Sequence, residues 1–116
     1  MEFTDRKPIY EQISDYFCRQ ILEEKLQPGD RVPSVREVAV QMEVNPNTAM
    51  RAFQALQEQE ILENRRGVGH FITEHAYEKT LEIERSEFIE NDLPLFFRKM
   101  ETLGFSCSDL KEIYDG

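Results

Sequence analysis

Two helix-start signals in the middle of the chain constrain its fold more than any other feature. Ser34-Val35-Arg36-Glu37 has the layout of a capping box, in which a serine and a glutamate three residues later satisfy backbone N–H groups reciprocally. Asn45-Pro46 combines a favoured N-cap with a proline, which suits the first position of a helix. The sequence therefore predicts two short helices joined by a tight turn around Glu43 and Val44.

Apolar residues at helical spacing support these two helices and predict an earlier one. The inner face of the helix after Ser34 is predicted to be Val35, Val38, Ala39 and Met42, and that of the helix after Asn45 to be Ala49, Ala52, Phe53 and Leu56. The earlier helix is expected to begin at Pro8 and to stop at Pro28-Gly29, with Ile9, Ile13, Tyr16, Phe17 and Ile21 along one side.

A β-hairpin is expected next. Residues 61–64 and 70–73 have the composition of two strands, and Arg65-Arg66-Gly67-Val68-Gly69 between them is typical of a hairpin tip. Arg31-Val32 before Pro33 is expected to be a short extended piece. The predicted fold class is mainly α with a small β-wing, which is a winged helix-turn-helix.

The composition changes after residue 75, so we predict a winged helix-turn-helix head over residues 1–75 and a short helical tail over residues 76–116. Asp92-Leu93-Pro94 is expected to break or kink the tail helix and to cap the next one, Gly104 to stop that helix, and Ser106 to cap a last one. A tail of this size cannot bury its apolar face within itself, so pairing of two copies through the tail helices is expected.

The net charge of −9 is unusual for a protein that binds nucleic acid, but acidic residues are absent from three stretches. These are residues 31–36, 44–57 and 64–73, which contain Arg31, Arg36, Arg51, Arg65 and Arg66. Charges more than about 10 Å away are largely screened at 0.1 M salt, so a local basic surface can still bind phosphates.

The second helix of a helix-turn-helix lies in the major groove, and its first residues contact base edges. In this chain Asn47 offers an amide to an adenine edge and Thr48 a hydroxyl to a base or phosphate. Arg65 and Arg66 at the hairpin tip are placed to follow the DNA backbone or enter the minor groove, and Gly67 lets the tip turn tightly.

At this point the sequence resembles the GntR family of bacterial regulators, and its YtrA-like subfamily in particular. The motifs that carry the resemblance are PIYEQI (8–13), PGDRVPSVREVA (28–39), VNPNT (44–48) and RRGVGHF (65–71), with a weaker match at LGFS (103–106). The family usually has glycine in the turn where this chain has Glu43, and a left-handed glutamate would cost about 1–2 kcal/mol.

The resemblance implies a homodimer on a double-stranded operator with two half-sites in an inverted repeat, and a repressor, with transport operons as the typical target. The DNA contacts that it implies are made by Arg36, Asn47, Thr48, Arg51, Arg65, Arg66 and Gly67.

Several alternatives stay open at this stage. Arg51 can form a salt bridge instead of a DNA contact, and Asn45 is expected to cap rather than to contact bases. His70 and His75 are weighed as metal ligands, and Cys18 and Cys107 as redox sensors; packing is the preferred interpretation for the cysteines. The tail aromatics can line a pocket for an unidentified small-molecule effector instead of a dimer seam; they are Tyr77, Phe88, Phe96, Phe97, Phe105 and Tyr114.

A winged-helix protein–protein adaptor is the alternative function, and an enzyme is not expected because no catalytic constellation, cofactor motif or metal motif occurs. The chain has no apolar stretch long enough for a membrane span, and its start lacks the layout of a signal peptide. The two cysteines do not have the spacing of a disulfide framework, so we expect a reduced, cytoplasmic protein.

Overall fold

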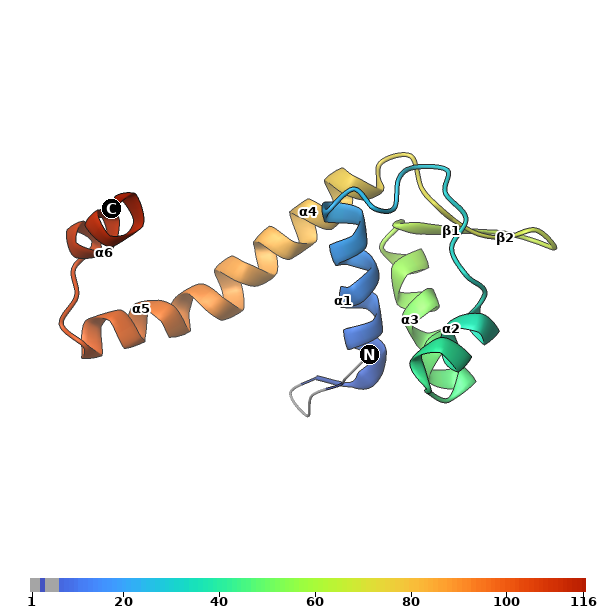
Figure 1. Cartoon of the computed structure of the whole chain (residues 1–116), viewed down its shortest axis with the longest axis horizontal. Helices are drawn as coiled ribbons and strands as arrows, with labels where there is room; N and C mark the ends of the chain where they lie inside the picture. Colours follow the sequence, from blue (N-terminus) through green and yellow to red (C-terminus); the bar gives the residue numbers. More distant parts are fainter. Residues whose placement is uncertain (1–2, 4–6) are drawn as a thin grey trace. The chain divides into compact units, whose positions relative to one another are not determined.

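The computed structural model describes residue 3 and residues 7–116. Residues 1–5, on which the signal-peptide argument depends, lie outside the described part except for residue 3. In chain order the elements are the helices α1 (Ile9–Leu22), α2 (Val35–Met42) and α3 (Pro46–Glu58), the strands β1 (Leu62–Arg65) and β2 (Gly69–Ile72), helix α4 (Ala76–Glu87), the π-helical turn η1 (Phe88–Asp92), and the helices α5 (Leu93–Thr102) and α6 (Cys107–Asp115) (Figure 1).

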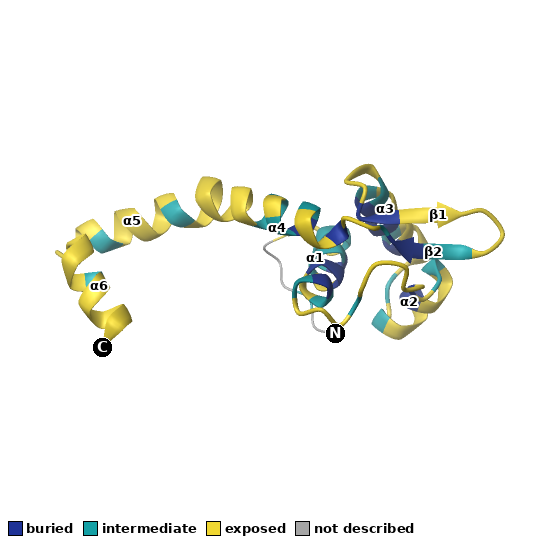
Figure 2. Cartoon of the chain, turned by 90° about the horizontal axis from the view of Figure 1, so that it is seen from above, coloured by how far each residue is buried: buried dark blue, intermediate teal, exposed yellow. Residues whose placement is uncertain are grey.

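Helix α3 is the central element of the first part of the chain, because it packs against α1, α2 and β1. Its predicted inner face is confirmed: Ala49, Ala52, Phe53 and Leu56 are all buried. The two alanines let the neighbouring helices approach closely, while Phe53 fills the space between them and meets the ring of Phe17 edge-on at 5.8 Å between centroids. Helices α2 and α3 and the hairpin all lie on one side of α1 (Figures 1 and 2).

The turn between α2 and α3 forms as the capping signals predict. The Glu37 backbone N–H donates to Ser34 Oγ at 3.1 Å, and the Ser34 N–H donates to Glu37 Oε1 at 3.4 Å. Glu43 ends α2 in the left-handed conformation, with φ 56° and ψ 48°. The Asn45 side chain then caps α3 by accepting from the Asn47 N–H at 2.8 Å.

The hairpin is an antiparallel pair in which Leu62 faces Ile72 and Arg65 faces Gly69. The preceding extended piece runs beside β2, since Val32 N–H donates to the His70 carbonyl and Ile72 N–H to the Asp30 carbonyl, at 3.0 and 2.9 Å. The predicted hairpin and extended piece are therefore confirmed, but both strands lie one residue closer to the tip than predicted, so Arg65 and Gly69 belong to the strands and not to the turn.

The first helix departs from prediction at both ends. Pro8 is its N-cap rather than its first residue, and the helix ends at Leu22, before Pro28-Gly29. The stop comes earlier because Glu24 adopts the left-handed conformation (φ 60°) and the Lys25 N–H bonds back to the Gln20 carbonyl at 2.9 Å.

The prediction that Asp92 caps a new helix is wrong. Asp92 has helical backbone angles, and its side chain makes no capping bond, whereas an N-cap needs an extended conformation. The five-residue π turn η1 precedes Pro94 instead, so the backbone stays helical up to the proline. Gly104 (φ 77°) follows the end of α5, and Ser106 caps α6 with Asp109, as predicted.

The chain divides into two compact units, residues 1–81 and residues 82–116, so the first unit runs past the predicted boundary at residue 75. All the described residues that are buried lie between Ile13 and Thr80 (Figure 2). The fold class is the predicted one, mainly α with a two-stranded β-wing. No helix in the described part of the chain is both long and apolar enough to cross a membrane.

Candidate nucleic-acid interface

One face of α3 is free of contacts with the core. Asn47, Met50, Arg51 and Gln54 are exposed there, at a spacing that places them on one stripe of a helix. Thr48 is half-buried, and its backbone N–H donates to the Asn45 carbonyl at 2.9 Å. The structure thus brings together the predicted Asn47, Thr48 and Arg51, and adds Gln54, which the sequence analysis missed although its spacing from Asn47 and Arg51 was visible.

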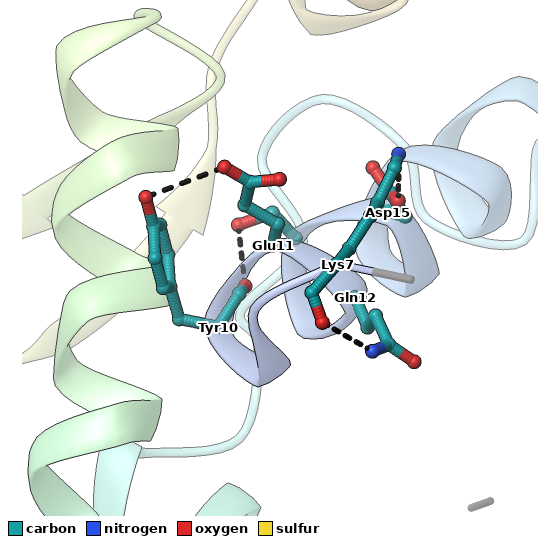
Figure 3. Close-up of polar contacts among 6 residues, drawn as sticks. Lys7, Tyr10, Glu11, Gln12 and Asp15 are labelled. Atoms are coloured by element: carbon teal, nitrogen blue, oxygen red, sulfur yellow. Dashed lines mark hydrogen bonds and ion pairs between the residues drawn. The ribbon is translucent and has the colours of Figure 1, made fainter. Parts of the chain in front are cut away.

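Arg51 is held by helix α1 rather than by an acidic neighbour. Its guanidinium carbon lies 4.2 Å from the centroid of the Tyr10 ring, a cation–π contact. The Tyr10 hydroxyl donates to Glu11 Oε1 at 3.4 Å, which fixes the ring on the side of α1 that faces α3 (Figure 3). Among the residues that the structure describes, no carboxylate forms an ion pair with Arg51, so the salt-bridge alternative is replaced by a contact that leaves the guanidinium exposed.

The start of α1, which carries Tyr10, is fastened by polar contacts of its own (Figure 3). Lys7 Nζ pairs with Asp15 Oδ2 at 2.8 Å, and Gln12 Nε2 donates to the Lys7 carbonyl at 2.8 Å. The ring under Arg51 therefore belongs to an anchored helix end.

The two arginines of the wing have different surroundings. Arg65 lies on β1, where its Nε donates to Glu63 Oε1 at 2.7 Å and its guanidinium covers the Phe71 ring at 4.1 Å. Arg66 is exposed in the turn, and no described residue pairs with it. The turn closes by a bond from Val68 N–H to the Arg65 carbonyl at 2.8 Å, with Gly67 at φ 76° where a side chain would be strained.

Arg36 is exposed on the first turn of α2. The extended piece that precedes α2 carries a further arginine that the predicted contact set omits: Arg31, which forms a β-bridge with Phe71. The signal was present, since Arg31 begins an acid-free stretch that ends at Arg36.

The histidines and cysteines have ordinary surroundings. His70 packs edge-on against Phe53, with 4.8 Å between ring centroids, and its burial lowers the pKa of its imidazole below the usual value. Within residue 3 and residues 7–116, no three His, Cys, Asp or Glu side chains are grouped so that they could hold a metal ion. Cys18 is buried and Cys107 is exposed, and neither is part of a disulfide.

The model of one protein family, described as "Bacterial regulatory proteins, gntR family", matches residues 9–72, which is more than half of the chain. The chain belongs to the GntR family. It is therefore a transcriptional regulator with a winged helix-turn-helix DNA-binding domain, and not an enzyme.

Relatives and solved structures agree with this assignment. The GntR chain is 37% identical over 111 residues to the HTH-type transcriptional regulator YhcF of Bacillus subtilis, covering 96% of this chain and 90% of YhcF. It is 44% identical over 69 residues to the transcriptional repressor YtrA of Bacillus subtilis, covering 60% of this chain and 53% of YtrA, which supports the YtrA-like subfamily.

A GntR family transcriptional regulator from Listeria monocytogenes superposes with a TM-score of 0.81, at 35% identity over 97% of each chain. The DNA-binding domain of AraR, solved in complex with operator ORR3, superposes with a TM-score of 0.57, at 25% identity over 63% of this chain and 88% of that domain.

Proposed function

We propose that this GntR protein is a homodimeric repressor that binds an inverted-repeat operator. The observation that carries the proposal is the combination of an exposed stripe on α3 with an arginine-bearing wing on the same head. AraR, whose DNA-binding domain has the same fold, binds an operator through that domain, and YtrA is named a repressor. In this chain the first turn of α3 enters the major groove and the wing follows the adjacent backbone.

Each side chain has a role in this arrangement. Asn47 contacts an adenine edge and Thr48 a base or phosphate, while Arg51 reaches the duplex from its fixed position over Tyr10. Arg36, Arg65 and Arg66 neutralise phosphates, and Gly67 lets the backbone of the turn approach the duplex. The stretches that carry these residues contain no acidic side chain, so their surface complements a negatively charged partner. The phosphate backbone of DNA fits this surface better than the protein partner of an adaptor.

Pairing through the helical tail over residues 76–116 is supported by the lack of a buried core among the described residues 82–116. None of the described residues in this unit is buried, although α5, α6 and their connection carry large apolar side chains. The exposed ones are Leu95, Phe96, Phe97, Leu103, Phe105, Ile113 and Tyr114. Apolar surface of this extent marks an interaction site, and a second copy removes it from water at about 25 cal/mol per Å². A dimer seam would cover exposed aromatic side chains that are spread over α5, α6 and their connection, so it is preferred to an effector pocket.

A selection experiment tests the proposal. The full chain is incubated with a randomised pool of duplexes of about 30 base pairs, three helical turns, and bound duplexes are sequenced. We expect an inverted repeat with half-sites about one helical turn apart, whereas enrichment of no sequence would contradict sequence-specific binding. Transport genes beside the selected sequence in the genome are the expected target.

The wing is tested on the selected duplex with Arg66→Ala. Loss of one phosphate contact from each protomer, two from the dimer, should flatten the dependence of log K on log salt by roughly 1.8. Arg19→Ala is the matched control, because Arg19 is exposed on α1 about half a helical turn from the buried Phe17 and Ile21. Equal slopes for the two variants would exclude Arg66 from the interface.

A further inference from the structure

The outer face of the wing contains residues that are not among the proposed DNA contacts. In the hairpin register, Glu63 faces Phe71 and Arg65 faces Gly69. Paired residues and residues two apart on a strand share a face, so these four lie together, while the buried Leu62 and Ile72 are on the opposite face. We name this set, with Arg31, the outer wing face.

Arg31 joins this face through Gly69. The backbone of Arg31 is bridged to Phe71, and its side chain lies across the backbone of Gly69. A Cβ added to Gly69 would be 2.8 Å from Arg31 Nε, which is closer than real Cβ contacts, so the Arg31 side chain would have to shift. The distance to its guanidinium carbon would be 3.4 Å, an ordinary van der Waals contact. Gly69 also has φ 140°, a conformation that residues with a side chain rarely adopt. Glycine therefore lets the Arg31 guanidinium rest on the strand.

The outer wing face holds two guanidinium groups and one carboxylate. Glu63 pairs with Arg65, whose guanidinium also covers the Phe71 ring, so Arg65 is fixed by two contacts. Arg31 is exposed, and no carboxylate in the described part of the chain pairs with it. Arg31 therefore presents a positive charge that none of the described acidic side chains offsets, beside Arg65, which already has a carboxylate partner.

We propose that Arg31 is a further DNA-binding residue, which contacts a backbone phosphate beside the wing and is positioned by Gly69. The inference rests on the proposed binding of operator DNA. Gly69 is two residues from Gly67 in the turn, about 7 Å along a strand, so a duplex that touches the tip comes within reach of Arg31. A planar guanidinium with a free edge pairs with phosphate oxygens in bidentate fashion. Because it lies back from the tip, Arg31 contacts the backbone and not base edges, so it carries no sequence preference.

The salt dependence of binding tests this role in the full chain. Dissociation constants are measured over a series of salt concentrations on two probes, the duplex selected by the wild-type chain and a scrambled duplex of equal length. Arg31→Gln removes one phosphate contact from each protomer, two from the dimer, so it should flatten the log–log slope by roughly 1.8 and weaken binding roughly 25- to 100-fold near 0.1 M salt, by the same factor on both probes. The charge-matched control Arg19→Gln, on the outer side of α1, should leave the slope unchanged.

Other outcomes overturn the proposal in distinguishable ways. An unchanged slope for Arg31→Gln, together with a flatter slope for Arg66→Ala, removes Arg31 from the interface and leaves the proposed function intact. A loss confined to the selected duplex would mean that Arg31 reads bases. If the selection with the wild-type chain enriched no duplex, the proposed function would fail and the role of Arg31 with it.

A double-mutant cycle tests the positioning by Gly69. Gly69→Ala should weaken binding in the wild-type background and should have no further effect on binding in the Arg31→Gln background, since its effect passes through Arg31. Arg31→Lys, which keeps the charge without the planar fork, should recover most of the salt slope. Equal losses from Gly69→Ala in both backgrounds, with melting curves confirming a folded head, would show that Gly69 acts independently of Arg31.

Discussion

At the scale of single residues, the turn between α2 and α3 contains a local conflict between sequence and conformation. Glu43 is left-handed, like Glu24 and Glu60, which follow α1 and α3. In an L-residue this conformation brings Cβ close to the following carbonyl oxygen. Each of the three helices of the head is therefore followed, within two residues, by a glutamate in a conformation that glycine or asparagine would adopt at lower cost.

Replacing Glu43 by glycine should therefore stabilise the protein. We expect a gain of about 1 kcal/mol, because relief of about 1–2 kcal/mol of backbone strain is partly offset by the greater entropy of glycine in the unfolded chain. The gain is measured as a shift of the denaturant midpoint. Glu43→Ala removes the same charge but keeps Cβ, so an equal gain in that variant would contradict the conformational explanation.

The sequence predicts the conformation of a residue well where neighbouring residues determine it. It predicts the conformation poorly where a contact with a distant part of the chain determines it. Ser34, Asn45 and Ser106 cap helices because capping needs only neighbouring residues. The stacking of Arg51 on Tyr10 and of Arg31 across Gly69 joins separate elements, and no spacing rule in the sequence anticipates it.

At the scale of elements, the wing is joined to the recognition helix through His70. This residue lies on β2 and packs its ring against Phe53 of α3, which is fully buried. Burial disfavours the charged imidazolium and lowers the pKa of His70 below its ordinary value of 6.5. The contact between wing and helix therefore favours a neutral ring.

The stability of the protein should consequently fall as the pH is lowered through 6.5. Below that pH the unfolded chain binds a proton at His70 that the folded chain does not, so the contribution present at higher pH is progressively lost down to the folded pKa. Melting temperatures between about pH 7.5 and about pH 5.5 should show a smaller decline for His70→Gln than for the wild type. His75→Gln, at an exposed position before α4, is the control and should retain the wild-type decline.

Element boundaries show the same division between local and spatial causes. The hairpin and α3 match prediction because turn residues, caps and apolar spacing agree there. Proline and glycine are the strongest local signals for a helix end, but they did not predict where α1 ends or that a π turn precedes Pro94. A helix can end or change its hydrogen-bonding pattern several residues before such a residue.

At the scale of the whole molecule, the first unit contains the core and residues 82–116 contain none of the buried residues that are described. Truncation after Leu81 should therefore give a folded head. Light scattering should show a monomer, and binding to the selected duplex should weaken by roughly 10²–10⁴-fold, because the second half-site is no longer tethered. A truncated product that stays dimeric would contradict the proposed role of the tail.

The position of the core early in the chain also has a consequence for biogenesis. Ribosomes release the N-terminal part first, and a domain generally folds as a unit once its own residues are available. Each nascent chain can therefore fold its head before the helices that follow Thr80 have paired with a second copy. Newly made protein would therefore exist first as a folded monomer. The concentration of this monomer would then set the rate at which dimers accumulate.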